Sequence, residues 1–518
     1  MTIRFMIVGL LLGALTACGA PTTPSAPAAA PTALPVSAQQ LPTVTTAPSA
    51  VPPASPTKES TALPTAPLDN PTTAAPIATA LPATASDSAT PLLVFPTARG
   101  LMTVRADGTG KTSIANTATT ISRNLSDGAA AHGWLAFRSG AGSLDIMGTT
   151  AQTVTLNLQS LPTGTLTTIT PLFSPAMEQA IKAANGDRTD AIEAGIAILE
   201  NSDTLKWSPD GRYVAFIAAI DGPSSDVYSY DRDTKQINRL TDGPNQAANL
   251  FWSPDSKWIV HEEVESFGTG AGWNVKAVWA AAPDGNNTRK LYDATSSGGE
   301  VFVNWLSPEK FLVYSWTVMG WHNVRAVDLN TGKAQLIGPK FDVQTLAYDP
   351  KTQTQLYFVD DFAAQQNGLS GGLYFAAAGQ AKLMASGDWY ETRWLPHAQL
   401  FFAKGKDGVI SVTPEGVVKK YGGEEALPID APDGAWLLAW GDGNYTSPIG
   451  LRLYTPDGEV KRTITSDAVA FATWSPDATS VFYQSGGQLY FVEIPNGEPQ
   501  LIGDSTAQEL SNIGWIKP

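Results

Sequence analysis

Two short patterns in this 518-residue chain contain residue types that enzymes use for chemistry, and the first is Gly-Thr-Gly-Lys-Thr-Ser at residues 108–113. It contains the Gly-Lys-Thr end of a phosphate-binding loop. The complete loop needs a further glycine five residues before Gly110, and a helix after it. Arg105 occupies that position, and the Ser-, Thr- and Asn-rich residues that follow show no helical period. We therefore expect a turn between two strands here and no nucleotide site.

The second pattern, Gly368 to Gly372, fits the G-x-S-x-G pattern of serine hydrolases, with Ser370 as the nucleophile. Such a serine needs a strand-to-helix elbow, followed along the chain by an acid and a histidine. Ser370 instead lies in a polar loop between two expected strands, and only His397 follows it. We expect no catalytic role for it.

Metal ligands are the next possibility, but the four histidines of the chain have no short metal-ligand spacing. His261, Glu262 and Glu263 are consecutive, yet neighbouring residues of a strand point to opposite faces. The sequence predicts no metal site and no cofactor.

The start of the chain has the layout of a secretory signal: Arg4, then the apolar run Phe5 to Leu15, then small residues before Cys18. The run is too short to span a bilayer. The small residues before the cysteine resemble the bacterial lipobox, in which that cysteine is lipidated and becomes the mature N-terminus. Because Cys18 is the only cysteine of the chain, lipidation explains it better than a disulfide or a metal site. We expect a lipoprotein signal peptide at residues 1–18 and an extracytoplasmic, membrane-anchored bacterial lipoprotein, at the cell surface or in the periplasm.

Residues 19–90 consist almost wholly of Pro, Ala, Thr and Ser, with no aromatic residue. A segment of this composition cannot bury a core, so we expect a disordered tether. Nearly all of the net charge of −15 therefore belongs to residues 91–518. An acidic domain argues against binding to nucleic acid and against direct binding to an anionic membrane, so the expected link to the membrane is the lipid on Cys18.

Residues 91–518 contain an internal repeat of short apolar strands and tight turns. Its cleanest copy is Trp207-Ser208-Pro209-Asp210-Gly211, and close copies begin at Trp252 and Trp474. Each copy continues into a second hairpin, often through Asp-Gly, which favours a tight reversal of an antiparallel pair. Four strands per repeat at this spacing are typical of a β-propeller blade. The Trp-Ser-Pro-Asp-Gly signature resembles the repeat of the TolB-type propeller family, which implies a fold and no activity.

The number of blades and the closure of the ring follow from counting the repeats. The first repeat lacks an inner strand, and the last residues, 512–518, form an orphan strand of that type, so we expect the C-terminus to complete the first blade. A divergent blade is expected at residues 133–170. We expect an all-β propeller of four-stranded blades, eight as the best estimate within a range of seven to nine. Residues 176–201 show helical spacing with a break at Asn185-Gly186, which predicts a small helical insertion.

One face of such a ring carries the tight turns after the first and third strands of each blade, and the other carries the longer loops after the second and fourth. Aromatic residues among acids in the long loops suit a binding face, although packing of these rings within their own loops is an equal alternative. The residues of the expected binding face are Trp273, Trp321, His322, Asp361, Asp388, Trp389, Tyr390 and Tyr445, with Phe362 and Asn444 in the same loops. Trp321 and Trp389 are the expected anchors.

The sequence as a whole predicts a lipid-anchored, monomeric propeller that acts as a non-catalytic binding or interaction module. Its expected partner is a protein, peptide or polysaccharide of the cell envelope. The alternative is an extracellular propeller enzyme, a hydrolase or lyase acting on glycans or peptides, with acids gathered at the channel mouth. Convergence of Asp and Glu side chains on the long-loop face would favour the alternative.

Overall fold

The chain divides into two units, Met1–Thr84 and Ala85–Pro518. The computed structural model describes residues 90–516 of the second unit, apart from 115–119, 122–129, 141–152, 162–163, 185–186, 188, 200–202, 267–272, 295–298, 318–319, 342, 422–426, 442–449 and 509. The expected signal peptide and nearly all of the expected tether lie outside the described residues. None of the described helices is both long and apolar enough to cross a membrane.

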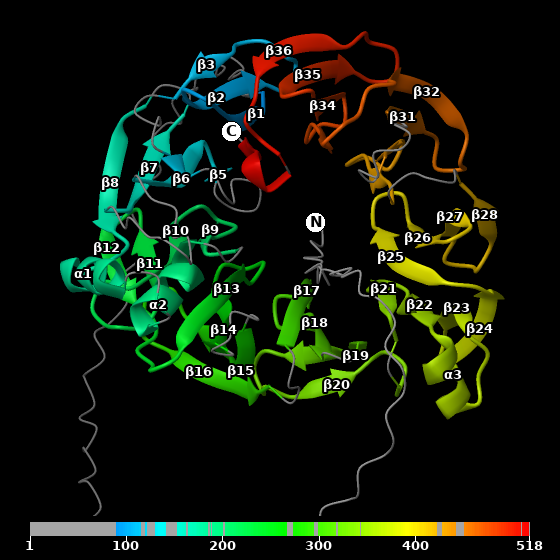
Figure 1. The fold of residues 1–518 in the computed structure, drawn as a ribbon, viewed down its shortest axis with the longest axis horizontal. Helices are drawn as coiled ribbons and strands as arrows, with labels where there is room; N and C mark the ends of the chain where they lie inside the picture. Colours follow the sequence, from blue (N-terminus) through cyan, green and yellow to red (C-terminus); the bar gives the residue numbers. More distant parts are fainter. Residues whose placement is uncertain are drawn as a thin grey trace, which may run out of the picture. The chain divides into compact units, whose positions relative to one another are not determined.

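The described part of the second unit is an all-β propeller of nine antiparallel sheets, which follow one another around a ring (Figure 1). We number the blades in chain order and give their strands from the centre of the ring outward. Blade 1 contains β37 (Gly514–Ile516), β1 (Leu92–Thr97), β2 (Gly100–Arg105) and β3 (Thr112–Ser113). Blade 2 contains β4 (Thr120–Ile121) and β5 (Ala130–Ala131), which both pair with β6 (Trp134–Ser139), and then β7 (Thr155–Ser160) and β8 (Leu166–Pro171). Blade 3 contains β9 (Leu205–Trp207), β10 (Tyr213–Ala218), β11 (Asp226–Asp231) and β12 (Gln236–Arg239).

The next three blades have the same order of strands. Blade 4 contains β13 (Gln246–Trp252), β14 (Ile259–Ser266), β15 (Trp273–Ala281) and β16 (Thr288–Asp293). Blade 5 contains β17 (Gly299–Ser307), β18 (Lys310–Thr317), β19 (Gly320–Asp328) and β20 (Ala334–Leu336). Blade 6 contains β21 (Thr345–Asp349), β22 (Thr354–Val359), β23 (Gly372–Ala377) and β24 (Gln380–Ala385).

The last three blades complete the ring. Blade 7 contains β25 (Trp389–Leu395), β26 (Leu400–Gly405), β27 (Gly408–Val412) and β28 (Val418–Lys420). Blade 8 contains β29 (Ile429–Asp430), β30 (Leu437–Trp440), β31 (Leu451–Tyr454) and β32 (Val460–Thr465). Blade 9 contains β33 (Phe471–Trp474), β34 (Ser480–Ser485), β35 (Gln488–Glu493) and β36 (Gln500–Asp504). The nine sheets of the described residues are the upper end of the expected range and one more than the best estimate, because the divergent blade 2 is a complete sheet.

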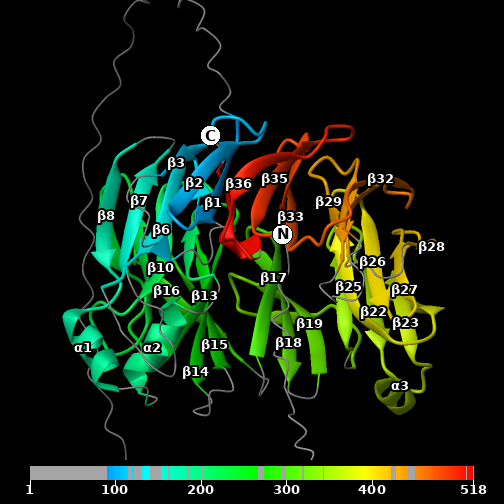
Figure 2. The same cartoon turned by 45° about the horizontal axis from the view of Figure 1, so that its top comes forward.

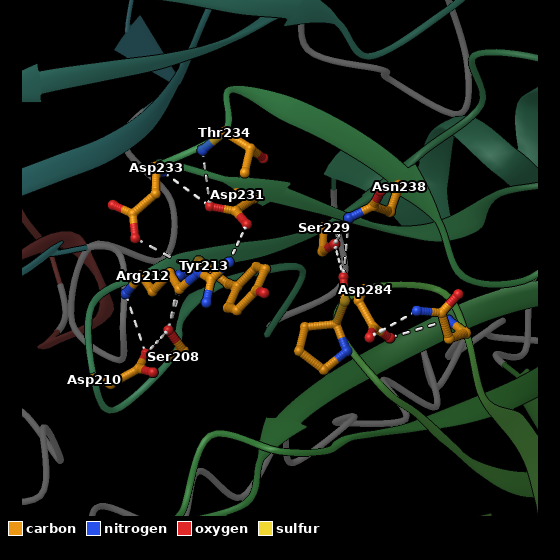
Figure 3. Close-up of polar contacts among 12 residues, drawn as sticks. Ser208, Asp210, Arg212, Tyr213, Ser229, Asp231, Asp233, Thr234, Asn238 and Asp284 are labelled. Carbon is orange, nitrogen blue, oxygen red and sulfur yellow. Dashed lines mark hydrogen bonds and ion pairs between the residues drawn. The ribbon is translucent and has the colours of Figure 1, made fainter. Parts of the chain in front are cut away.

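The Trp-Ser-Pro-Asp repeat forms the turn between the first and second strands of a blade. In blade 3 the buried Ser208 hydroxyl donates to Asp210 Oδ1 at 2.5 Å and accepts the backbone N–H of Tyr213 at 2.9 Å (Figure 3). The carboxylate of Asp210 also accepts the backbone N–H of Arg212. Ser253 and Ser475 make the same contacts in blades 4 and 9. The repeat is therefore a hydrogen-bonded turn whose polar groups satisfy one another.

The two ends of the second unit meet in blade 1. Leu92, Leu93 and Val94 of β1 pair with Ile516, Trp515 and Gly514 of β37 in antiparallel register. This pairing confirms the predicted closure by the C-terminal strand.

Each sheet packs face to face against the next. Apolar clusters fill the contacts, for example Phe251 stacked on Phe302 between blades 4 and 5, with ring centroids 4.1 Å apart. Polar contacts add to them: Ser229 and Asn238 of blade 3 both donate to the carbonyl oxygen of Pro283, in the outer turn of blade 4 (Figure 3). Side chains thus join the blades, together with backbone hydrogen bonds such as that from the Ala219 N–H to the Leu172 carbonyl oxygen, at 2.8 Å.

The helices lie in the connections of the long-loop face, which we define as the connections after the second and fourth strands of each blade. The opposite side is the short-turn face. Helices α1 (Pro175–Ala184) and α2 (Asp190–Leu199) follow β8, whereas α3 (Asp361–Asn367) follows β22. Figure 2 shows all three on one side of the ring. A short 3-10 helix, η1 (Leu510–Asn512), precedes β37. Helices α1 and α2 confirm the predicted insertion of two short helices, whereas Asn185-Gly186, the predicted break, lies outside the described residues.

Candidate functional site

The pattern that resembles a phosphate loop is a hairpin turn between β2 and β3, the third and fourth strands of blade 1, as predicted. Asp107 Oδ1 accepts the backbone N–H of Thr109 at 2.9 Å. The Lys111 ammonium donates to the carbonyl oxygen of Ile502 in blade 9, at 2.6 Å. The lysine therefore joins two blades instead of facing an open loop.

Ser370 and His397 lie on opposite faces of the ring. Ser370 stands between α3 and β23, on the long-loop face, and follows a helix instead of preceding one. His397 is in the turn between β25 and β26, on the short-turn face, with Nδ1 3.3 Å from Asp430 Oδ2. This placement excludes a Ser370–His397 pair.

Of the remaining histidines, His261 is buried in β14, and desolvation lowers its pKa to about 3, so it is neutral. His132 Nε2 lies 2.8 Å from the carbonyl oxygen of Pro209. Among the described residues, no group of three His, Cys, Asp or Glu side chains is arranged to hold a metal ion.

Helix α3 carries Phe362, which has the most exposed aromatic ring among the described residues of the expected binding face. Asp360 caps its N-terminus by accepting the backbone N–H of Ala363 at 2.7 Å, and Gly368 ends it in the left-handed conformation. These caps place Phe362 on the first turn, where the residue is 69% exposed, next to the exposed Asp361. The polar composition of this segment predicts a loop, although the flanking Asp360 and Gly368 are typical helix caps.

The connection from β24 to β25 carries the second exposed part of the face. Asp388 is exposed, and Tyr390 is 58% exposed while its hydroxyl donates to the carbonyl oxygen of Gly405 at 2.8 Å. Trp389 points the other way: it is only 7% exposed, packs against Gly405 and donates from Nε1 to the carbonyl oxygen of Ser386 at 3.3 Å. The prediction that Trp389 is an exposed anchor is therefore wrong, because its ring belongs to the core of blades 6 and 7.

The other residues of the expected face are described less fully or not at all. Trp273 begins β15, and Trp321 and His322 follow the first residue of β19, so all three backbones lie at the long-loop ends of their strands. Their side chains, and Asn444 and Tyr445 altogether, lie outside the described residues. Of the expected face, the exposed residues that the structure describes lie on blades 6 and 7: Asp361, Phe362, Asp388 and Tyr390.

Blades 4 and 5 each bury a glutamate that no local sequence pattern marks. Glu262 in β14 is 5% exposed, and Glu300 in β17 is 4% exposed. Glu262 lies on the same face of its strand as Val260, which packs against the aromatic rings of blade 5. Glu263, on the opposite face, accepts a hydrogen bond from Trp279 Nε1 at 2.8 Å. Glu262 and Glu263 therefore lie on opposite faces of β14.

Glu300 has several hydrogen-bond partners, whereas Glu262 has few. Glu300 accepts the Tyr292 hydroxyl at 2.5 Å and pairs with the Arg325 guanidinium. Glu262 accepts the Asn249 side-chain amide at 2.7 Å. Burial, with the charges of Glu300 and Asp203 adding to it, raises the pKa of Glu262 to about 8. Both carboxyl groups are therefore shielded from solvent and held by protein groups.

The helical insertion is part of the core. Every residue of α2 from Ala191 to Leu199 is buried, and the helix packs with β9, β10 and β13 in one apolar cluster. The Arg138 guanidinium of blade 2 donates to the carbonyl oxygen of Ile198 near the end of α2, and to Thr204 at 3.2 Å. The insertion therefore packs against the blades.

Comparison with known proteins identifies the fold and goes no further. No protein-family model matches the chain. A stretch of 61 residues is 36% identical to the uncharacterized peptidase YuxL of Bacillus subtilis (strain 168), but this is 12% of the chain and only 9% of that protein.

Among solved structures, one described as the eukaryotic initiation factor superposes with a TM-score of 0.52 at 12% identity, over 83% of this chain and 99% of the other. The β-propeller domain of the Trilobed protease from Pyrococcus furiosus superposes at 0.38 and 11% identity, over 74% and 99%. The first of these superpositions shows that the two chains share a fold. At 12% identity it does not indicate an activity for this chain.

Proposed function

We propose that this protein is a lipid-anchored extracytoplasmic propeller that acts as a non-catalytic binding module for a protein, peptide or polysaccharide of the cell envelope. The observation that carries the proposal is the exposure of Phe362 and Tyr390 beside Asp361 and Asp388 on one face of neighbouring blades. An aromatic ring held in solvent by a capped helix adds nothing to the core, and exposed aromatic residues dominate binding energetics when they become buried in an interface. The acids favour a cationic or hydroxyl-rich ligand.

The test compares a Phe362→Ala, Tyr390→Ala double variant with the wild type on arrays of purified envelope glycans and peptides. We expect at least a tenfold loss of affinity for any ligand that the wild type binds, which is about 1.4 kcal/mol. The matched control is a Val460→Ala, Leu501→Ala double variant, which truncates two other exposed apolar side chains, on the outermost strands of blades 8 and 9. If the folded Phe362, Tyr390 variant binds as well as this control, the proposed face is wrong.

An enzyme acting on peptides or glycans is the second candidate, and the local likeness to a protein named as a peptidase favours it. The buried acids Glu262 and Glu300 do not support an enzyme, because both are shielded from solvent and accept hydrogen bonds from protein groups. Hydrolysis of a peptide or glycan substrate by purified wild-type protein, lost in a folded variant of a residue on the long-loop face, would establish this second candidate instead.

A further inference from the structure

Helix α3 is attached to its blade mainly by hydrogen bonds near its two ends. All seven of its residues are described, and Ala364 alone is buried. At the N-terminus, the capping carboxylate of Asp360 also accepts a hydrogen bond from Gln344 Nε2, at 2.6 Å. After the C-terminus, the carbonyl oxygen of Ser370 accepts the hydroxyl of the buried Tyr374 at 2.7 Å. Because apolar packing contributes so little, these hydrogen bonds determine where the helix lies on blade 6.

Thr345, the residue after Gln344 and the first of β21, is bonded to the neighbouring blade. Its hydroxyl lies 2.7 Å from the Thr392 hydroxyl of β25 and accepts the backbone N–H of Thr392 at 3.0 Å. Both threonines are 5% exposed, so water competes little for these bonds. The inner strands of blades 6 and 7 are therefore joined by directional hydrogen bonds, in addition to the apolar cluster around Trp389.

A β-bulge in β25 places Tyr390 in solvent next to the buried Trp389. The register of β25 with β26 shifts between Trp389 and Glu391, so Tyr390 is the extra residue of the bulge. A bulge can re-aim a side chain out of the regular alternation of a strand. The Tyr390 hydroxyl donates to the carbonyl oxygen of Gly405, and Trp389 packs against the same glycine. The position of the exposed ring is therefore defined, two residues before Thr392.

We infer that Gln344 and Thr345 are positioning residues, which fix helix α3 and strand β25 relative to each other on the long-loop face. Gln344 is linked to α3 through Asp360, and Thr345 is linked to β25 through Thr392. Since Gln344 and Thr345 are consecutive, a single short segment of backbone connects the two links.

The consequence for binding rests on the proposed function. Phe362 follows Asp360 by two residues, and Tyr390 precedes Thr392 by two, so each exposed ring is close along the chain to one of the links. A ligand that contacts both rings then orders the protein less on binding, because the rings are already fixed relative to each other. Such a site suits an extended ligand, a peptide or glycan chain of several units that contacts two neighbouring blades.

The experiment measures the distance between spin labels at Gln366→Cys in α3 and Lys406→Cys in the turn after β26, by pulsed electron paramagnetic resonance. Both positions are exposed, and Cys18→Ala removes the only natural cysteine of the full chain. We expect one narrow distance distribution when the links are intact. A Gln344→Leu, Thr345→Val double variant, which removes both links at similar side-chain volume, should widen the distribution roughly twofold or more.

Two further variants separate positioning from a general loss of stability. Gln246→Leu removes a comparable glutamine bond in blade 4, where Gln246 begins β13 and accepts the backbone N–H of Ser225 at 2.7 Å. It should leave the distribution narrow, and so should Thr345→Ser, which keeps the hydroxyl. Gln344→Leu alone serves if the double variant does not fold. An unchanged width in the folded variant, or equal widening in Gln246→Leu, would overturn the inference.

A second measurement tests the consequence for binding on the same glycan and peptide arrays. The Gln344→Leu, Thr345→Val variant should bind an extended ligand about tenfold more weakly than the wild type, whereas Gln246→Leu should bind it equally well. Equal affinity of the double variant would overturn this step. Because the spin-label distances are measured without a ligand, failure of the binding-face proposal leaves the positioning of α3 and β25 unaffected.

Discussion

The indole of Trp515 stands edge-on against the ring of Phe482, with the ring centroids 5.5 Å apart and the planes at 76°. Trp515 belongs to β37 of blade 1 and Phe482 to β34 of blade 9, so this contact lies across the seam where the ring closes. The Trp515 Nε1–H also donates to the Thr473 hydroxyl of blade 9 at 3.3 Å. The last strand thus binds the neighbouring blade through a ring contact and a hydrogen bond, besides pairing with β1.

Trp515→Ala should destabilise the propeller by about 2–4 kcal/mol, because it leaves a cavity against Phe482 and removes the contact across the seam. Denaturant unfolding of the isolated propeller measures the change. Leu501→Ala, at an exposed position of the same blade pair, is the control and should change the free energy of unfolding by less than about 0.5 kcal/mol. Equal stability of the two variants would show that the seam does not depend on the indole.

Ser208→Ala should lower the free energy of unfolding by about 1–3 kcal/mol. It removes the buried hydroxyl that donates a hydrogen bond to Asp210, and it leaves the backbone N–H of Tyr213 without this acceptor. Thermal and denaturant unfolding, compared with the exposed-site variant Ser386→Ala, measure the loss. Ser253→Ala and Ser475→Ala should behave alike, because the same turn recurs in their blades. A negligible effect at all three serines would mean that the repeat signature reflects something other than turn stability.

The lowered pKa of Asp231 leads to a prediction about the stability of the protein at acidic pH. The hydrogen bond from the Arg212 guanidinium, 2.7 Å from Asp231 Oδ2, lowers the pKa of Asp231 to about 2 (Figure 3). A carboxyl group with a lowered pKa stabilises the folded state above its ordinary pKa, near 3.8, and loses that contribution as the pH falls toward 2.

Asp231→Asn should therefore flatten the decline of stability between about pH 4 and pH 2, while leaving its shape above pH 5 unchanged. Unfolding free energies measured across this range provide the test, with Asp242→Asn as a control at an exposed acid. The same acid decline in Asp231→Asn as in the wild type would contradict the assignment.

The lipid anchor is tested at Cys18. Cys18→Ala should move the protein from the membrane fraction to the soluble fraction, because no other acylation site is expected in the chain. Fractionation with mass analysis of the mature N-terminus measures this, and Cys18→Ser provides a second variant without a thiol. A wild-type protein that carries no acyl mass, or an alanine variant that stays in the membrane, would rule out the lipoprotein proposal.

The parts of the fold that depend on local chemistry were predictable from the sequence. Repeated Trp-Ser-Pro-Asp turns and the missing first strand specify the blades and their closure, and Asn185-Gly186 marks the break between two helices. Helix α3 was also predictable, since Asp360 and Gly368 are its caps, but its seven residues are too few for a helical period to stand out.

Features that depend on neighbouring blades were not predictable. Trp389 directly follows a long-loop connection, a position at which exposed residues are common, but its side chain is buried. A register shift between Trp389 and Glu391 of β25 accompanies this burial. Glu262 and Glu300 are buried acids that no local sequence pattern marks. Their burial follows from how the sheets pack, which the period of a single strand does not encode.

The pairing of β1 with β37 also determines when the propeller can be completed. A chain that emerges from a ribosome or an export channel N-terminus first exposes β1 early, but its inner partner arrives only after eight further blades. Until then blade 1 has an unpaired inner edge, and blade 9 lacks the indole that seals it. The ring thus becomes topologically closed only with its final strand, so partial products of synthesis or export remain open arcs that proteases and chaperones can recognise.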